Sequence, residues 1–169
     1  MDSGELLTRW TVRLALSLYV FSLCLRLLSR GRRSWLACAR LAWTAGYLAF
    51  LVHVACAFHF YHHWSHAAAY EATARQTEEV VGQPWGAGLY ANYAFAVVWG
   101  ADVLWWWISL TSYQGRPRWI EWAVQAILAF IAFNATVVFG SGAIRWLGLS
   151  ACVLLAGLFV FLPRLPGPR

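Results

Sequence analysis

The sequence predicts an all-α, polytopic integral membrane protein: a five-helix transmembrane bundle with its N-terminus outside and its C-terminus cytoplasmic. Composition is the first observation, because 61% of the 169 residues are hydrophobic and only 12% are charged. Soluble domains average roughly 45–50% apolar and about 25% charged residues, so this chain could not cover a water-exposed surface. Long apolar runs and the distribution of arginines are the other two observations. We therefore expect a single transmembrane domain over residues 1–169.

The first predicted helix, about 10–28, carries Arg13 and Arg26 near its ends, where long side chains can extend to the lipid headgroups. A cleaved signal peptide would have its positive charges before the apolar run, whereas here the arginine cluster follows it. We therefore expect a retained helix that begins outside. The second predicted helix, about 36–62, is a longer apolar run that ends in a histidine-rich stretch.

The segment 65–87 is the one sizeable part expected outside the membrane, on the outer face. It is rich in strong helix formers. Either the second predicted helix continues into this segment, or a new helix begins here with Ser65 as its N-cap; Gly82 and Pro84 are predicted to end it. This outer segment sends the chain back into the membrane.

Three more helices complete the expected bundle. The third, about 88–110, is apolar except for Asp102. The fourth and fifth, about 119–140 and 145–162, are joined by a Gly-Ser-Gly sequence that is typical of a tight turn.

The arginines determine the expected orientation. All 13 basic residues are arginines, and with this topology nine lie inside and four outside, as is usual for cytoplasmic loops. The formal charge of +6 therefore belongs to membrane loops, and we expect no nucleic-acid partner. An all-arginine set fits a bacterial inner membrane. The nine inner residues are Arg26, Arg30, Arg32, Arg33, Arg40, Arg116, Arg118, Arg164 and Arg169.

All five histidines lie within 14 residues at the outer end of the second predicted helix. On a continuous helix, four of them would share a face about 100° wide, in i,i+4 pairs that let two imidazoles reach one metal ion. We expect a transition-metal site of Cu, Fe or Zn type, for redox chemistry or metal handling. The alternative is a belt of polar rings that anchors the helix at the interface. The expected ligands are His59, His62, His63, His66 and, deeper in the membrane, His53.

The fragment His59-x-x-His62-His63 resembles one histidine box of the membrane desaturase and hydroxylase families. Those families bind two irons with several boxes on different helices and loops, whereas this chain has one box and no histidine outside the stretch of residues 53–66. A complete site of that kind would need ligands from a second chain. No zinc-protease, serine-hydrolase, phosphate-loop or dinucleotide motif is present, so enzymatic activity stays open and no catalytic residue is assigned.

Asp102 lies well inside the third predicted helix, where a lone charge costs several kcal/mol. Arg40 lies at a similar depth on the neighbouring antiparallel helix. We therefore expect a structural Arg40–Asp102 ion pair, with a proton or cation relay at Asp102 as the alternative.

Two classes of function fit these patterns. The first is a membrane protein with a histidine-rich metal site at the outer end of helix two. The second is a non-catalytic structural or accessory subunit that docks a partner through the outer segment, with its histidines as anchors or pH-responsive groups. A third reading, an enzyme that acts on lipid, needs ligands from another chain. The expected partners are the lipid bilayer and either another protein or a second copy of the chain; beyond a transition metal, no cofactor is expected.

Overall fold

A computed structural model describes residues 3–29 and 32–161, with side chains described as far as residue 158. Within these ranges the chain is helical, with short turns and no strand, which confirms the all-α class. The predicted end of the last helix, residue 162, lies outside the described residues. The elements are α1 (Ser3–Leu28), α2 (Arg33–Phe60), α3 (His66–Val81), α4 (Gly88–Ile108), α5 (Leu110–Gln114), α6 (Arg118–Phe133), a π-helical turn (Asn134–Val138) and α7 (Ala143–Phe161).

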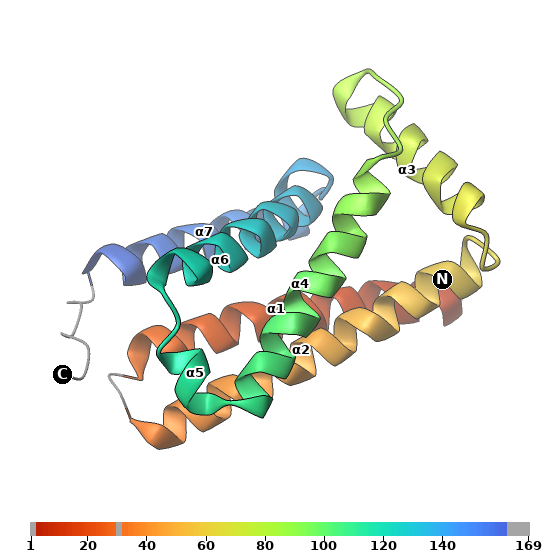
Figure 1. The fold of residues 1–169 in the computed structure, drawn as a ribbon. Helices are drawn as coiled ribbons and strands as arrows, with labels where there is room; N and C mark the ends of the chain where they lie inside the picture. The colour runs from red at the N-terminus through yellow and green to blue at the C-terminus, as the bar shows by residue number, and fades with distance from the viewer. Residues whose placement is uncertain (1–2, 30–31, 162–169) are drawn as a thin grey trace.

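Helices α1 and α2 form a long antiparallel hairpin, and α4 crosses it (Figure 1). The Ser22 hydroxyl donates to the carbonyl oxygen of Ala39 at 2.7 Å and joins the two helices. Gly46 of α2 lies at a close contact among α1, α2 and α4. A Cβ atom at Gly46 would lie 3.1 Å from the Trp99 ring and 3.2 Å from Leu18. The missing side chain therefore lets the three helices pack closely.

An aromatic cluster fills the junction of α1, α2 and α4. Trp43 and Trp99 are completely buried, and their ring centroids lie 5.3 Å apart. Tyr19, Phe50 and Phe95 surround Trp99 at centroid distances of 5.8, 6.1 and 5.3 Å. Large rings in offset and edge contacts contribute more than their buried area alone. The centre of the fold is thus a three-helix aromatic core.

Helices α6 and α7 form a second hairpin, which contacts α4 through α6 and α1 through α7. Its turn contains the π-helical segment Asn134–Val138. Gly140 follows, where a Cβ atom would lie only 1.9 Å from the carbonyl oxygen of Thr136. The Nε of Arg145 donates to the carbonyl oxygens of Val137 and Gly140 at 2.9 and 3.1 Å. Arg145 thereby pairs backbone carbonyl oxygens that have no amide partner at the end of the helix.

Helix α3 lies across one end of the bundle, between the end of α2 and the start of α4 (Figure 1). We call this the α3 end, and the opposite end, where α5 lies, the α5 end. The Ser65 hydroxyl accepts from the amide of Ala68 at 3.2 Å, and Gly82 closes the helix with φ of 80°. Both predicted caps are confirmed. The buried residues of α3, Ala69 and Thr77, are small and allow close approach to α4.

Three of the described helices are long and apolar enough to cross a membrane: Ser3–Leu28, Arg33–Phe60 and Arg118–Val138. Helix α7 adds a shorter apolar stretch, Ala143–Leu158. Many large apolar side chains on these helices are exposed, as at Leu41 of α2. Such extensive apolar surface is unusual on a soluble monomer and is typical of a surface that faces lipid.

Candidate functional site

The histidine-rich stretch does not continue helix α2. The helix ends at Phe60, and a turn follows in which His63 and Trp64 have φ of 47° and 60°. This left-handed conformation is uncommon for residues other than glycine, and it breaks the helical register. The prediction that four histidines share one face of a continuous helix is therefore wrong. Those four are His59, His62, His63 and His66.

The histidines contact separate neighbours. His53, within α2, has its Nδ1 2.9 Å from the carbonyl oxygen of Thr8 on α1. His66, the first residue of α3, has its Nδ1 3.0 Å from the Tyr93 hydroxyl on α4. His59 rests against neighbouring aromatic rings. In the part of the chain that the structure describes, no three His, Cys, Asp or Glu side chains are arranged to hold a metal ion.

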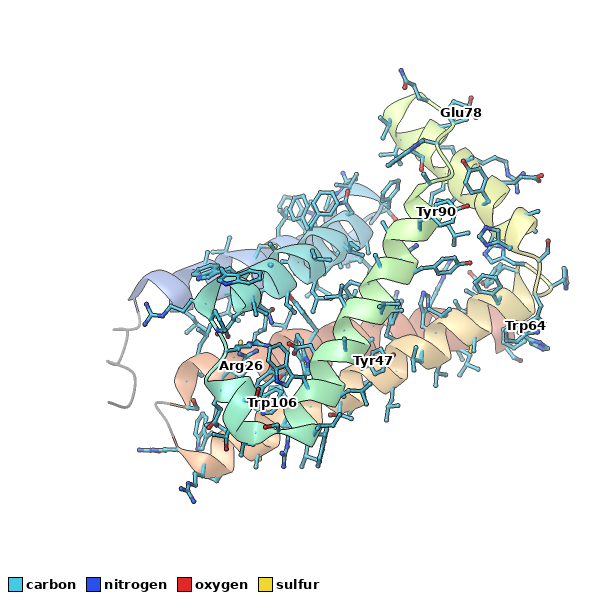
Figure 2. The ribbon with its side chains drawn as sticks, viewed as in Figure 1. Arg26, Tyr47, Trp64, Glu78, Tyr90 and Trp106 are labelled. Carbon is cyan, nitrogen blue, oxygen red and sulfur yellow. The ribbon has the colours of Figure 1, made fainter. Side chains whose placement is uncertain are left out.

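His66 belongs to a cluster of rings between α3 and α4 that includes Tyr90, which Figure 2 labels. Its ring centroid lies 5.8 Å from those of both Tyr90 and Tyr93, and Tyr70 lies 6.2 Å from Tyr90. Tyr70 also covers Gly86, where a Cβ atom would lie 2.5 Å from the ring. These rings fix the position of α3 on α4.

His62 lies in the turn between α2 and α3. Burial is the main cause, and the neighbouring His63 the second, of a pKa for His62 below the ordinary histidine value. The ring is therefore neutral at pH 7, the form in which one nitrogen can accept a hydrogen bond or ligate a metal.

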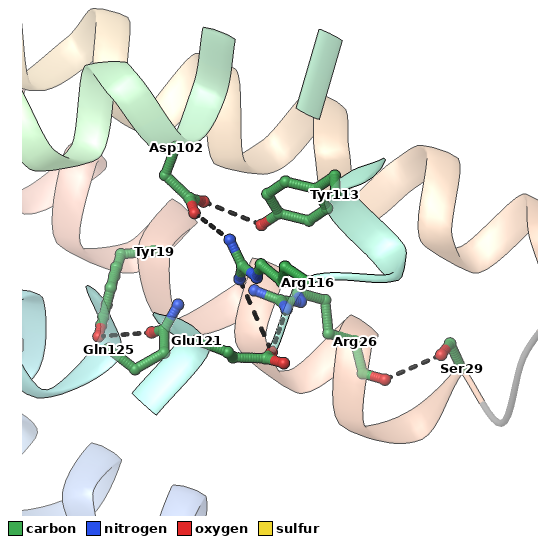
Figure 3. Close-up of polar contacts among 8 residues, drawn as sticks. All are labelled: Tyr19, Arg26, Ser29, Asp102, Tyr113, Arg116, Glu121 and Gln125. Atoms are coloured by element: carbon green, nitrogen blue, oxygen red, sulfur yellow. Dashed lines mark hydrogen bonds and ion pairs between the residues drawn. The ribbon is translucent and has the colours of Figure 1, made fainter. Parts of the chain in front are cut away.

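A buried polar network lies at the α5 end, where α1, α4 and α6 meet (Figure 3). The Asp102 carboxylate accepts hydrogen bonds from Arg116 and, at 2.9 Å, from the Tyr113 hydroxyl. The side chains of Asp102 and Arg116 are only 1% and 2% exposed. Burial raises the pKa of Tyr113, so its hydroxyl keeps its proton and acts as the donor. Trp106 stacks on the Tyr113 ring with a centroid distance of 4.7 Å.

The predicted Arg40–Asp102 ion pair is wrong, because Arg116 occupies the position opposite Asp102. The Arg40 guanidinium instead lies 4.1 Å from the ring centroid of Trp107. Trp107 follows Asp102 by five residues, which turns it about 140° around the helix axis at 3.6 residues per turn. Arg40 thus approaches α4 on a different side from Asp102.

Arg26 of α1 and Glu121 of α6 extend the network. Arg26 donates to Oε1 of Glu121, and the same oxygen lies 3.9 Å from Nη2 of Arg116. The two guanidinium groups also lie over aromatic rings: Arg26 is 5.3 Å from the Trp106 centroid, and Arg116 is 4.1 Å from that of Tyr113. Two cations from different segments therefore converge on one carboxylate.

Sequence reasoning missed this network because the chain reverses after α4. Ser109 interrupts the helix, and its hydroxyl accepts from the amide of Ser112 at 3.3 Å to begin α5. The sequence Gly115-Arg116-Pro117 then turns Arg116 back toward Asp102. This Gly-Arg-Pro turn signal was available in the sequence, but the third predicted helix was extended over Ser109.

No known protein family matches this chain, and no curated protein or solved structure matches it significantly. Two features of the chain itself bear on function: α3 with the histidine turn, and the buried network around Asp102.

Proposed function

We propose that this protein is a non-catalytic membrane subunit that docks a protein partner through α3. The observation that carries the proposal is the position of this helix. It lies across the end of the bundle, has a cap at each end, and packs mainly against α4 (Figures 1 and 2). A helix held in this way presents its other sides as a fixed surface, which lowers the cost of ordering it on binding.

The exposed side chains of α3 indicate the chemistry of the partner. Glu71 and Arg75 form an exposed pair 4.0 Å apart, whereas Glu78 and Glu79 lie in the last turn of the helix. Acidic residues at a helix C-terminus oppose the helix dipole, so they do not stabilise α3 itself. Val81 beside them is 64% exposed. Val80 is also 46% exposed, and two exposed valines beside two carboxylates fit a partner that presents an apolar side chain with basic side chains around it.

The proposal includes five membrane crossings, with the N-terminus outside and α3 on the outer face. Helices α1, α2, α4, α6 and α7 alternate in direction (Figure 1), which supports it. Arg32 and Arg33, at the start of α2, lie at the α5 end, as the positive-inside tendency predicts for a cytoplasmic end. We propose a bacterial cytoplasmic membrane as the location, on the basis of the all-arginine basic set.

Single-cysteine labelling tests the topology. On a background without the four native cysteines, Gln76→Cys on α3 should react with a membrane-impermeant maleimide in intact cells. Thr111→Cys on α5 should react only after the membrane is opened. The reverse pattern, or reaction of both in intact cells, would contradict the proposed orientation.

Photo-crosslinking tests the docking. A benzophenone amino acid at Gln76 should give one discrete adduct in native membranes, and the reversal Glu78→Arg/Glu79→Arg should abolish it. The matched control is the same probe at Val153 of α7, which is 73% exposed on an apolar helix and should contact lipid only. No adduct at Gln76, or the same adduct at Val153, would refute docking through α3.

A transition-metal site in the histidine turn is the second proposal, and the position of His59, His62 and His63 around the break after α2 favours it. Such a site would require the turn to rearrange, because His66 now bonds to Tyr93. Elemental analysis of the detergent-purified protein after metal loading decides between the two. Stoichiometric Cu, Fe or Zn that is lost in His59→Ala/His63→Ala would establish a function in redox chemistry or metal handling. Absence of metal in both proteins would leave docking.

A further inference from the structure

The network at the α5 end contains more buried donors than acceptors. Among the described residues, Nε and Nη2 of Arg116, Nη1 of Arg26 and Nε2 of Gln125 are buried without a hydrogen-bond partner. Arg116 Nη2 has an ion-pair contact with Glu121, but at 3.9 Å this is too long for a hydrogen bond. Buried donors are nearly always paired in folded proteins. Here, Arg26 and Arg116 lie beside the Glu121 carboxylate, and this acceptor leaves several of the buried donors unpaired (Figure 3).

The two carboxylates of the network are not equivalent. Asp102 is buried and accepts from both Arg116 and Tyr113, so it cannot leave without stranding a buried cation. Glu121 is 44% exposed and can rotate into solvent. Its carboxylate therefore occupies the position between the two guanidinium groups as a replaceable anion.

The surroundings of this position favour an anion. Gln125 follows Glu121 by four residues on α6, so the two side chains lie on the same face of the helix. Helix α6 begins at Arg118 with no side-chain cap, which leaves the positive end of its dipole beside the site. The rings of Trp106 and Tyr113 hold the arginine side chains in place.

We propose that Arg26, Arg116 and Gln125 form a phosphate-binding site, in which a phosphate group replaces the carboxylate of Glu121. A phosphate group presents more oxygens than a carboxylate, in a tetrahedral arrangement. It can therefore accept from two guanidinium forks and an amide together. The phosphate can come from the headgroup of an anionic phospholipid, since arginines crowd this end of the bundle, or from free phosphate.

Thermal unfolding of the purified protein in dodecyl maltoside tests the site. Three probes are titrated separately: dihexanoyl-phosphatidylglycerol, inorganic phosphate, and dihexanoylglycerol, which has the same acyl chains without phosphate. We expect saturable stabilisation by the phosphorylated lipid and none by dihexanoylglycerol. Stabilisation by the lipid but not by inorganic phosphate identifies a lipid headgroup as the ligand, whereas stabilisation by both identifies phosphate chemistry from either source.

Two variants connect the binding to these residues. Glu121→Gln removes the competing carboxylate from a half-exposed position, and it should tighten the apparent Kd about fivefold. Arg26→Gln keeps the Asp102–Arg116 pair that holds the fold, and it should weaken binding about tenfold or more. The matched control is Glu5→Gln, which removes the carboxylate of the exposed Glu5–Arg9 pair at the other end of α1.

The control variant Glu5→Gln should bind the phosphorylated probes with the same affinity as the wild-type protein. The proposal is overturned if neither phosphorylated probe stabilises the protein, if dihexanoylglycerol stabilises it equally, or if Glu121→Gln and Glu5→Gln alter the affinity to the same extent. Weaker binding in Glu121→Gln would also overturn it, because the carboxylate would then be a supporting group and not a competitor.

Discussion

Replacing Asp102 by asparagine removes the carboxylate charge while it keeps the shape of the side chain. Arg116 then loses its charge partner in a site where the two side chains are only 1% and 2% exposed. Removing one partner of a buried ion pair costs about 3–5 kcal/mol of unfolding free energy. The Tyr113 ring, 4.1 Å from the Arg116 guanidinium, stays in place and offsets part of this loss. We therefore expect a loss of about 3 kcal/mol, at the lower end of that range.

The assay is equilibrium unfolding in mixed micelles of dodecyl maltoside and sodium dodecyl sulfate, followed by far-ultraviolet circular dichroism. The double variant Asp102→Asn/Arg116→Gln should lose roughly 2 kcal/mol less than the sum of the two single variants. Arg40→Gln is the matched control, because Arg40 contacts Trp107 and not Asp102. Its coupling to Asp102→Asn should stay within about 0.5 kcal/mol. Stronger coupling to Arg40 than to Arg116 would refute the assignment of the pair.

Three further outcomes follow from local contacts. Gly46→Leu should lower the unfolding free energy by about 1–3 kcal/mol in the same assay, because it inserts a side chain into a close contact among three helices; Gly157→Ala, whose Cβ would meet no atom within 4 Å, should not. Ser65→Ala should weaken α3 by about 1 kcal/mol, seen as faster amide hydrogen exchange in its first turn, and Ser65→Asp should restore protection. By imidazole NMR, His62 should titrate below the ordinary pKa of about 6.5, mainly through burial and secondarily through His63. Because the unfolded chain then binds the proton more readily, stability should fall as the pH drops below about 6.5. A titration midpoint of His62 at or above that value would contradict the burial of its ring.

The ends of α3 could be predicted from the sequence because each depends on one local residue. Ser65 accepts a backbone hydrogen bond within its own turn, and Gly82 adopts a left-handed φ that costs glycine little. Neither requires knowledge of distant contacts. The all-α class is equally accessible, since it follows from the apolar runs alone.

The histidine turn could not be predicted in the same way. Its left-handed residues are His63 and Trp64, and neither glycine nor proline marks the break. Helical spacing therefore predicts that the four histidines from His59 to His66 share one helix face, whereas in the structure they lie before, within and after a turn. The bond between His66 and Tyr93 joins residues far apart in the sequence, and no periodicity reveals it.

The ion pair shows a different limit. The prediction compared the depth of Arg40 on α2 with that of Asp102 on the antiparallel α4. Arg40 does reach α4, but it contacts Trp107 there. Depth does not fix the direction around the helix axis, and Asp102 faces away from that contact toward Arg116. Helix spacing within α4 separates the two faces, but which face meets α2 is decided by packing around Trp99.

The two ends of the bundle are held by different interactions, and this determines which of them costs less free energy to move. At the α5 end, moving α4 would separate Asp102 from Arg116 and leave a charge buried without its partner. At the α3 end, the contacts between α3 and α4 that would have to break include the ring contacts around Tyr90 and the bond between His66 and Tyr93. His66 is exposed and Tyr93 is half-buried, so water can hydrate their polar groups once α3 is displaced. The free energy of breaking their bond is therefore smaller than that of separating the buried ion pair. Movement of α3 about its caps therefore costs less free energy than movement of α4, and it leaves the geometry of the α5 end unchanged.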